Sequence, residues 1–272
     1  MGVLNVTPDS FYDGGRYADR RRALDHARRM LDDGAAIIDI GGESTRPGAA
    51  PTPESQEFDR VLPLFEALVA ESDERGVALS VDTRKPAVMR AAIGAGASMV
   101  NDISALRADG AIDAIAKSGA AICLMHMQGE PLTMQKSAVY DDDVVAVVAA
   151  FLVERALACE RAGVARGRIA VDPGFGFGKT LEHNLELLRR LPEIVALGYP
   201  VVAGLSRKST IGALTGRNVE ERGAGSLAAA LSAIARGASL VRVHDVRETV
   251  DALKVWQAVE PGRHTDSASG SA

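Results

Sequence analysis

One stretch of the sequence, Asp172–Lys179, combines a carboxylate, two phenylalanines and a run of glycines. It follows the apolar run Arg168–Val171, so Asp172 stands at the end of a predicted strand that Pro173 stops. Glycine at every second position lets the backbone approach a flat or charged ligand closely. A nucleotide phosphate loop fits less well, because the position that requires its first glycine holds Pro173. We therefore interpret Asp172 as a binding carboxylate beside an aromatic wall.

Polar residues also follow the other apolar segments of strand length. One such residue can be a helix N-cap, and this interpretation is equally good for Thr83 and Asp102. Capping does not explain polar residues at every segment end. The residues at these ends, all polar except the two methionines, are Asn5, Asp39, Glu43, Asp82, Thr83, Arg84, Lys85, Asn101, Asp102, Met125, His126, Met127, Ser206, Arg207, Lys208, Arg242 and His244. We expect many of them to share one site.

Two carboxylates and an amide, on Asp82, Asp172 and Asn101, form the first predicted cluster. Held on a rigid rim, they suit a flat heterocycle that carries amino and N–H donors. A lysine would donate to the ring acceptors, and apolar side chains would cover the ring faces. The residues predicted for these two roles are Lys208, Met125 and Phe177.

A second cluster is predicted where the last strand would meet the first. Arg242 and His244 are two residues apart on a strand and therefore face the same side. Closure of a barrel would bring Asn5 beside them. An arginine fork binds phosphate, and one amide oxygen suits a Mg²⁺ ion that keeps most of its waters and shares phosphate oxygens. We expect a phosphate site here, with Mg²⁺ on Asn5.

Several other residues have a simpler structural interpretation. His126 lies between two methionines and is expected to pack in a loop, while His183 is expected to be structural at the start of a helix. Asp39 either lines the site or anchors a loop. The pair Arg189–Arg190 is expected on a solvated helix face. Lys179 has no assigned role.

Strand-like and helix-like segments alternate along the chain. The expected strands are residues 1–6, 35–40, 78–81, 98–100, 121–124, 168–171, 200–205 and 240–243. The expected helices are residues 19–33, 54–74, 86–95, 111–117, 142–162, 181–191, 209–236 (in one or two pieces) and 246–259. Apolar rather than alternating strands favour a parallel sheet covered by helices. We predict an α/β fold, a single-domain (β/α)₈ TIM barrel over residues 1–260, with an open doubly wound sheet as the alternative. Residues 261–272 are predicted to form a disordered tail.

The composition excludes several classes of protein. The chain has 272 residues, 47% hydrophobic and 25% charged, as in globular proteins with a large core. Its net charge of -5 gives no basis for binding nucleic acid or an anionic membrane. The two cysteines, Cys123 and Cys159, lie in apolar segments and indicate buried thiols rather than disulfides. Neither a membrane span nor the pattern of a signal peptide is found, so we expect a cytoplasmic protein.

Seven short motifs of this chain occur together in one known family. They are Asn5-Val-Thr-Pro-Asp-Ser-Phe11, Gly41-Gly-Glu-Ser-Thr-Arg-Pro-Gly48, Ser80-Val-Asp82, Val100-Asn-Asp102, Asp172-Pro-Gly-Phe-Gly-Phe-Gly178, Ser206-Arg-Lys208 and Arg242-Val-His244. The chain resembles the dihydropteroate synthases from Asn5 to about His244. The resemblance implies that a pterin is bound by Asp82, Asn101, Asp172 and Lys208, with Met125 and Phe177 beside it. It also implies that the pyrophosphate is held by Asn5, Arg242 and His244, with Mg²⁺ on Asn5.

The resemblance further implies a reaction and a second substrate. The methylene of 6-hydroxymethyl-7,8-dihydropterin pyrophosphate would be joined to p-aminobenzoate in an SN1-like substitution, giving 7,8-dihydropteroate and pyrophosphate. The residues implied for p-aminobenzoate are Phe11, Thr45, Arg46, Pro47 and Ser209. The residues implied for catalysis are Asp13, Arg46, Asp172, Lys208 and Arg242. Family members are typically dimers, which implies a homodimer.

Two other functions remain open from the sequence. A pterin-dependent methyltransferase would share the ring-binding residues, although the loop 44–48 and Ser206–Lys208 argue against it, and it would need a corrinoid partner. A non-catalytic pterin-binding barrel would keep the pocket, but it would have no reason to keep Asn5 and the two early loops.

Overall fold

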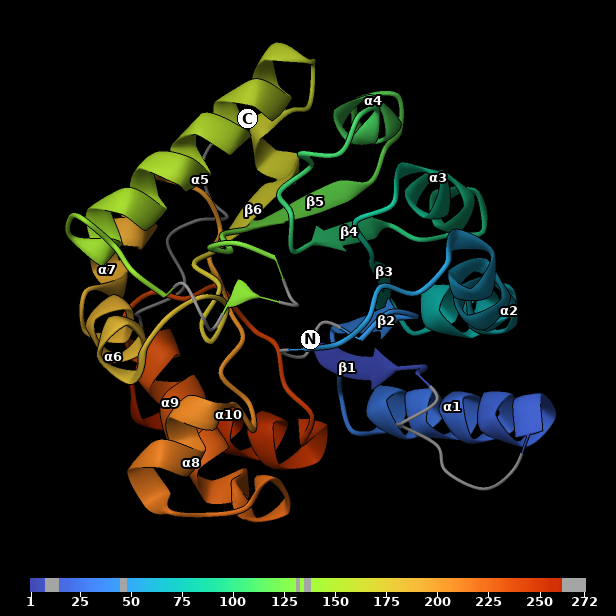
Figure 1. The fold of residues 1–272 in the computed structure, drawn as a ribbon. Helices are drawn as coiled ribbons and strands as arrows, with labels where there is room; N and C mark the ends of the chain where they lie inside the picture. The colour runs from blue at the N-terminus through green and yellow to red at the C-terminus, as the bar shows by residue number, and fades with distance from the viewer. Residues whose placement is uncertain (8–14, 45–47, 131–132, 135–137, 261–272) are drawn as a thin grey trace, which may run out of the picture.

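The computed structural model describes residues 1–7, 15–44, 48–130, 133–134 and 138–260. Within these ranges strands and helices alternate along the chain (Figure 1). The strands are β1 (Gly2–Asn5), β2 (Ile37–Gly41), β3 (Ala78–Asp82), β4 (Met99–Asp102), β5 (Ala121–Met125), β6 (Ile169–Asp172), β7 (Val202–Ala203) and β8 (Leu240–Val241). The helices are α1 (Gly15–Asp32), α2 (Glu54–Glu74), α3 (Pro86–Gly94), α4 (Ala111–Ala116), α5 (Val144–Arg161), α6 (Leu181–Arg189), α7 (Leu191–Val195), α8 (Ser209–Thr215), α9 (Gly223–Ala235) and α10 (Val246–Val259), with short 3-10 helices η3 (Arg166–Arg168) and η4 (Val219–Glu221). The predicted tail, residues 261–272, lies outside the described residues.

The strands pair in chain order and close on themselves. β1 to β6 form one parallel sheet, and β7 pairs in parallel with β8. Parallel bridges from Val171 to Val201 and from Gly2 to Val243 connect the two sheets on either side. At the second junction the Val3 amide donates to the Val243 carbonyl at 3.0 Å. The predicted barrel is therefore confirmed, and the open doubly wound sheet is wrong because the last strand lies beside the first.

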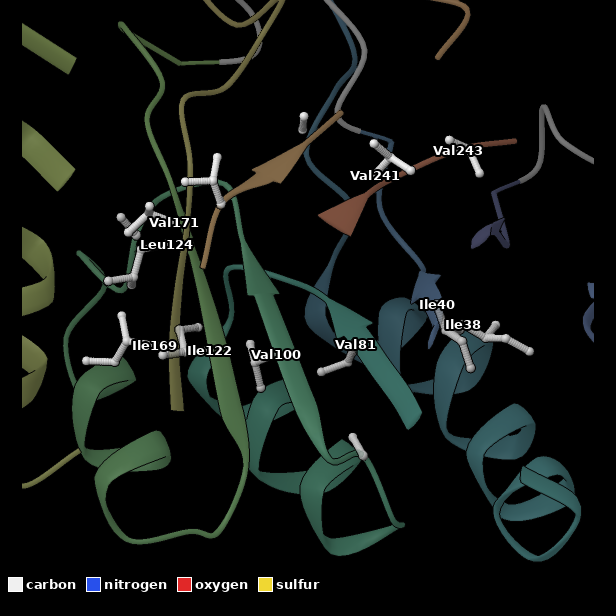
Figure 2. Close-up of a cluster of buried hydrophobic side chains, with 14 of the residues drawn as sticks. Ile38, Ile40, Val81, Val100, Ile122, Leu124, Ile169, Val171, Val241 and Val243 are labelled. Carbon is white, nitrogen blue, oxygen red and sulfur yellow. The ribbon is translucent and has the colours of Figure 1, made fainter. Parts of the chain in front are cut away.

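The outer face of the strands carries the main hydrophobic core. Figure 2 shows the branched apolar side chains of this face, including Ile38, Val81, Ile122 and Val171. These side chains are buried in one cluster with helix residues such as Leu64 of α2. Because successive side chains of a strand point to opposite sides, the residues between them point into the barrel.

The inner face changes from apolar to polar along the barrel axis. At one end a small cluster of Met1, Met99, Cys123, Ala170 and Val202 fills the interior. Further along the barrel axis, toward the C-terminal ends of the strands, the inward positions of β2, β3, β4 and β6 are polar. They are held by Asp39, Ser80, Asp82, Asn101 and Asp172. The strands thus combine an apolar outer face with a polar mouth, and this alternation places the predicted binding residues together.

Several predicted boundaries differ from those observed. The first helix starts at Gly15 rather than at residue 19. The predicted helix 181–191 corresponds to α6, which ends at Arg189, and the next helix, α7, was not predicted. Helix α7 carries Pro192 in its first turn, where the missing N–H costs no intrahelical hydrogen bond. The region 209–236 holds α8 and α9.

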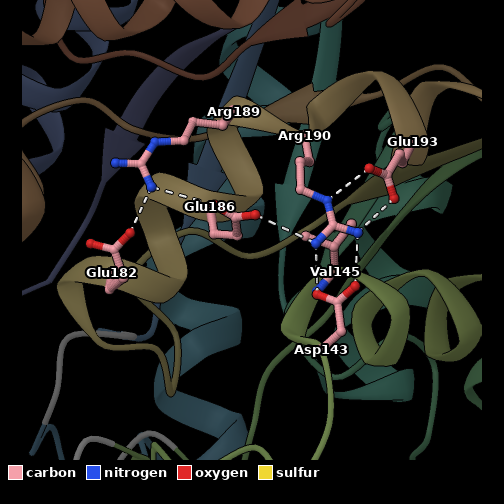
Figure 3. Close-up of polar contacts among 7 residues, drawn as sticks. All are labelled: Asp143, Val145, Glu182, Glu186, Arg189, Arg190 and Glu193. Atoms are coloured by element: carbon pink, nitrogen blue, oxygen red, sulfur yellow. Dashed lines mark hydrogen bonds and ion pairs between the residues drawn. The ribbon is translucent and has the colours of Figure 1, made fainter.

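Arg189, the last residue of α6, is solvent-exposed as predicted. Arg190 directly follows α6 at the surface and joins Asp143, the N-cap of α5, to Glu193 of α7 (Figure 3). Both cysteines are buried and free, as predicted. None of the described helices has the length and apolar character needed to span a bilayer.

Candidate active site

Arg242, which directly follows β8, lies between two carboxylates at the barrel mouth. Its Nε donates to Asp39 Oδ2 and its Nη2 donates to Asp82 Oδ2, each at 2.7 Å. Burial raises the pKa of Asp82 to about 7, although the Arg242 guanidinium opposes this change. Burial acts to lower the pKa of Arg242, but Asp39 and Asp82 outweigh it and raise that pKa above its ordinary value. The guanidinium therefore stays charged.

Asp39 is the central acceptor of this cluster. It is fully buried, and the same Oδ2 that binds Arg242 also accepts from Asn101 Nδ2 at 3.0 Å. Its other oxygen, Oδ1, and Ser80 Oγ are buried without a hydrogen-bond partner among the described residues. The sequence left Asp39 open between lining the site and anchoring a loop, and the structure places it in the site. The sequence signal for this position was the spacing of Asp39, two residues before Gly41 at the end of β2, because residues two apart on a strand face the same side.

Asp172 and Lys208 face each other on the other side of the mouth. A Cβ on Gly204 would stand 3.6 Å from Lys208 Nζ and 3.8 Å from Asp172 Oδ2, so this glycine leaves open the space between them. Lys208 Nζ donates to the Phe175 carbonyl and lies 4.7 Å from the centre of the Phe177 ring. Burial lowers the pKa of Lys208 to about 8, against the opposing effect of Asp172. Burial raises the pKa of Asp172, against the opposing effect of Lys208.

The two apolar residues predicted beside the ring also lie here. Met125, the last residue of β5, is buried with Ile103, Met127 and Met134, and Phe177 packs against this group. Sulfur and aromatic carbon thus form one polarisable wall, as the sequence predicts.

His244 and Asn5 lie where β8 meets β1. His244 Nδ1 is 3.0 Å from Ser206 Oγ, which also accepts from the His244 backbone amide at 3.2 Å. Burial lowers the pKa of His244 to about 4, with help from Arg242, so the imidazole is neutral at pH 7. Asn5 Oδ1 and Asp82 Oδ2 lie 3.6 and 3.7 Å from the point where a Cβ would stand on Gly41. Glycine here keeps open the space between an amide oxygen and a carboxylate.

The donor set fits Mg²⁺ only as a shared ion. The described residues contain no group of three His, Cys, Asp or Glu side chains that could hold a metal alone. Asn5 Oδ1 and Asp82 Oδ2 both lie beside Gly41, and Mg²⁺ commonly takes one or two such oxygens and completes its shell with water and phosphate. These residues fit an ion that arrives with a phosphorylated substrate.

Some predicted site residues cannot be placed. Phe11, Asp13, Thr45, Arg46 and Pro47 lie outside the described residues. Ser209 is described, exposed at the first position of α8 and directly after Lys208.

A charged network, whose pairing the sequence does not indicate, lies beside the ends of β2 and β3. Glu43 accepts from Arg84 at 3.1 Å and from Lys85, and Lys85 also binds the fully buried Glu57 of α2. Arg84 further reaches Glu130 at 3.1 Å. Arginine and lysine after β3 gave a weak signal, but nothing in the sequence indicated their partners.

Two residues considered as caps, and His183, have definite roles. Thr83 and Asp102 accept hydrogen bonds from the backbone amides of residues 85, 104 and 106, so they cap turns, and the helix N-cap interpretation is wrong. The N-caps of α3 and α4 are Lys85 and Gly110. His183 forms a capping box with Thr180 at the start of α6, which confirms its structural interpretation.

Comparison with known proteins identifies the family. Residues 1–244 match the model of the family described as pterin binding enzyme. The dihydropteroate synthase of Escherichia coli (strain K12) is 49% identical, over 95% of this chain and 90% of that protein. The chain belongs to the dihydropteroate synthases, a family of pterin binding enzymes.

Solved structures of this family agree. The Xanthomonas albilineans dihydropteroate synthase with 4-aminobenzoic acid has 55% sequence identity and a TM-score of 0.89, covering 95% of this chain and 92% of that one. The structure of the enzyme from the same organism in complex with 7,8-dihydropteroate has 52% identity and a TM-score of 0.86, with the same coverage. The predictions of family, of a transferase enzyme and of dihydropteroate synthesis are confirmed. Nothing in these comparisons favours a methyltransferase or a non-catalytic barrel.

Proposed function

We propose that the barrel mouth binds the pterin ring of 6-hydroxymethyl-7,8-dihydropterin pyrophosphate and carries its transfer to p-aminobenzoate. The observation that supports this most is the convergence of Asp82, Asn101, Asp172 and Lys208 at one end of the barrel. The first three lie at the ends of β3, β4 and β6, and Lys208 is the N-cap of α8. Two carboxylates, an amide and a lysine are the donors and acceptors that the edge of a pterin requires.

The contacts seen within the site suggest which atoms meet the ring. Asp82 uses Oδ2 for Arg242, and Asn101 uses its amide nitrogen for Asp39. Their other oxygens make no hydrogen bond to another described residue and are available as acceptors. Asp172 accepts from the Gly174 amide through Oδ1, which leaves Oδ2 on the side of Lys208. Met125 and Phe177 would then cover the faces of the ring.

The pyrophosphate would lie beside Asn5, Arg242 and His244. Arg242 holds its two carboxylates through Nε and Nη2, so Nη1 remains for phosphate oxygens. A neutral His244 would act as a hydrogen-bond donor rather than as a second cation. Mg²⁺ bound to Asn5 would neutralise charge on the departing pyrophosphate.

The chemistry requires little from a base. An arylamine is neutral and nucleophilic at pH 7, so the difficult step is departure of the leaving group. Asp82 and Asp172 would stabilise positive charge on the pterin as the carbon–oxygen bond breaks, giving an SN1-like substitution. The loops with Phe11, Asp13, Thr45, Arg46 and Pro47 would close over p-aminobenzoate and exclude water, and Ser209 would meet its carboxylate.

The chain is further proposed to act as a cytoplasmic homodimer through its late helices. Large apolar side chains are exposed on two of them, with Leu214 of α8, Val255 of α10 and Val259 of α10 at 58%, 67% and 71% exposure. Sedimentation of the purified protein would measure the oligomeric state, and a monomer at micromolar concentration would contradict this part of the proposal.

One assay tests the proposed reaction. The protein is mixed with the pterin pyrophosphate and Mg²⁺, with and without p-aminobenzoate, and both pyrophosphate and 7,8-dihydropteroate are measured. We expect coupled product that depends on p-aminobenzoate and falls when EDTA removes Mg²⁺. Absence of product at micromolar enzyme would reject the proposal, and product that is unchanged in EDTA would reject the role of Mg²⁺.

A further inference from the structure

Lys179 is the one residue of the stretch Asp172–Lys179 that the sequence left without a role. It is buried, with 3% of its surface exposed. Its Nζ lies 2.9 Å from His126 Nδ1 and donates to the carbonyls of Gly174 at 3.0 Å and Phe177 at 3.1 Å. A longer contact reaches the His126 carbonyl at 3.4 Å. These close contacts occupy the three N–H donors of a buried ammonium group, so Lys179 is not placed to bind phosphate.

These contacts join two loops of the barrel mouth. Gly174 and Phe177 belong to the glycine loop, defined as residues 173–180 between β6 and α6, whereas His126 directly follows β5. The glycine loop lies against the end of β5 so closely that a Cβ on Gly174 would stand 1.9 Å from the His126 carbonyl oxygen. With a φ of +69°, Gly174 is also in a conformation that favours glycine. The lysine thus fixes the loop at its point of closest approach.

The Gly174 residue connects the lysine to the pterin carboxylate. Its carbonyl accepts from Lys179, and its amide donates to Asp172 Oδ1 at 2.6 Å. Without the hydrogen bond from Lys179, the Gly174 backbone would be less constrained, and its amide would no longer hold the Asp172 carboxylate in one orientation. Phe177 is held in the same way, since its carbonyl also accepts from Lys179.

His126, after β5, is suited to accept a hydrogen bond from Lys179. Burial lowers its pKa to about 3, so the ring is neutral at pH 7, and it packs edge-on against Phe151 with 5.0 Å between ring centres. Burial lowers the pKa of Lys179 to about 7, and both of its protonation states keep at least two N–H donors.

We propose that Lys179 is a positioning residue of the pterin site, which fixes the glycine loop to the end of β5 and so orients Asp172 and Phe177. This inference rests on the proposed function, because it concerns the same pocket. It implies that removing the ammonium group weakens binding of the pterin substrate and leaves binding of p-aminobenzoate nearly unchanged, since the residues predicted for the second substrate lie on other loops.

The test compares Lys179→Met with Lys179→Gln. Methionine keeps a similar length without a donor, and glutamine keeps two N–H donors. We expect Lys179→Met to raise KM for the pterin pyrophosphate about 10-fold or more, with less than about a 2-fold change in KM for p-aminobenzoate. Lys179→Gln should lie between Lys179→Met and wild type. Calorimetry with the pterin pyrophosphate and Mg²⁺, without p-aminobenzoate, should show the same order of Kd.

A control separates positioning from a general loss of stability. Leu68 is fully buried in the C-terminal part of α2. This part of the helix leads into the start of β3 and so lies away from the barrel mouth. Leu68→Val should lower Tm without changing either KM. The proposal is overturned if folded Lys179→Met binds the pterin substrate as wild type does, or if both KM values rise equally.

Two further outcomes are distinguishable. If wild type itself does not bind the pterin substrate, the proposed function fails rather than the role of Lys179. If Lys179→Met does not fold, ¹⁵N NMR of His126 in wild type decides. The spectrum is recorded at pH 6, where the ammonium form of Lys179 predominates. An unprotonated Nδ1 then supports the contact with Lys179, and a protonated Nδ1 excludes it because two donors would face each other.

Discussion

Two arginines of this protein bind several carboxylates in very different surroundings. Arg242 binds two, and Arg190 binds three, including Glu186 at 3.4 Å. At the mouth, Arg242 reaches Asp39 and Asp82, both at 2.7 Å. On the outer surface, Arg190 reaches Glu193 and Asp143, also at 2.7 Å (Figure 3). The carboxylate side chains at the mouth are 0% and 8% exposed, whereas those on the surface are 54% and 41% exposed.

The difference in solvent exposure gives the two arginines different consequences. Water screens the surface pairs, which therefore contribute little to stability. At the mouth, the desolvation of three charges is compensated only while all of them are present, so removing one leaves an uncompensated buried charge. Desolvation makes the buried Arg242 cluster unfavourable to form, and we attribute its presence to its role in the reaction. The Arg190 cluster on the surface has a structural role, since it joins α5 to α7.

The largest effect is expected from Arg242→Ala. It should lower kcat/KM by roughly 10³-fold, because stabilisation of the departing pyrophosphate is lost. It should also lower the free energy of unfolding by about 3–5 kcal/mol, because Asp39 and Asp82 are left unpaired. Steady-state kinetics and urea unfolding measure both. If Arg242→Ala had wild-type stability, the buried ion pairs would contribute as little to the free energy of unfolding as the surface pairs of Arg190.

Asp172→Ala should reduce kcat/KM by about 10²- to 10³-fold through loss of charge stabilisation on the pterin. Arg242 pairs with two buried carboxylates, whereas Asp172 has one main charged neighbour, Lys208. We therefore expect Asp172→Ala to lower the free energy of unfolding less than Arg242→Ala does. Kinetics and thermal unfolding would check both parts. Near-normal activity would reject the assignment of the pterin pocket.

Asp39→Asn tests the role of Asp39, for which the sequence did not decide between lining the site and anchoring a loop. It places an amide where Arg242 Nε and Asn101 Nδ2 both donate, so both side chains should move. We expect kcat/KM to fall by about 10- to 100-fold, because displaced reacting groups cost about this much. A crystal structure of the variant would show the displacement. Unchanged kinetics would mean that Asp39 does not orient the site.

The pH dependence of pterin binding tests the lysine at the mouth. Burial lowers the pKa of Lys208 to about 8, so the ammonium form predominates below that pH and is lost as the pH rises through it. Binding of the pterin pyrophosphate should therefore weaken above pH 8. Asp82, with a pKa of about 7, gains charge as the pH rises and acts in the opposite sense. Calorimetry on wild type and Lys208→Arg measures this, and the arginine variant should lose the alkaline decline.

The smallest effect is expected from Arg190→Ala. We expect the free energy of unfolding to fall by less than about 1 kcal/mol and kcat/KM to stay unchanged, because the pairs are exposed and screened. Urea unfolding at low and high salt measures this, and the difference from wild type should shrink in salt. A loss as large as that of Arg242→Ala would remove the contrast between the two arginines.

Much of the fold could be predicted from the sequence, because apolar strands, intervening amphipathic helices and glycine- or proline-marked turns are local patterns. Most predicted boundaries lie close to those observed, and the polar residues at strand ends were found by position alone. The exceptions are local as well. The predicted helix 181–191 ends two residues early, before the separate helix α7 that carries Pro192, and Thr83 and Asp102 cap turns instead of helices.

The sequence by itself determined the family and the residue types of the site, since both depend on the order of residues along the chain. Only the tertiary structure decided the partners: Asp39 between Arg242 and Asn101, Glu43 with Lys85, and Lys179 with His126. These pairs are separated by 203, 62, 42 and 53 positions. Closure of the barrel brings them within hydrogen-bond distance, and burial there sets their charges, which no local pattern in the sequence encodes.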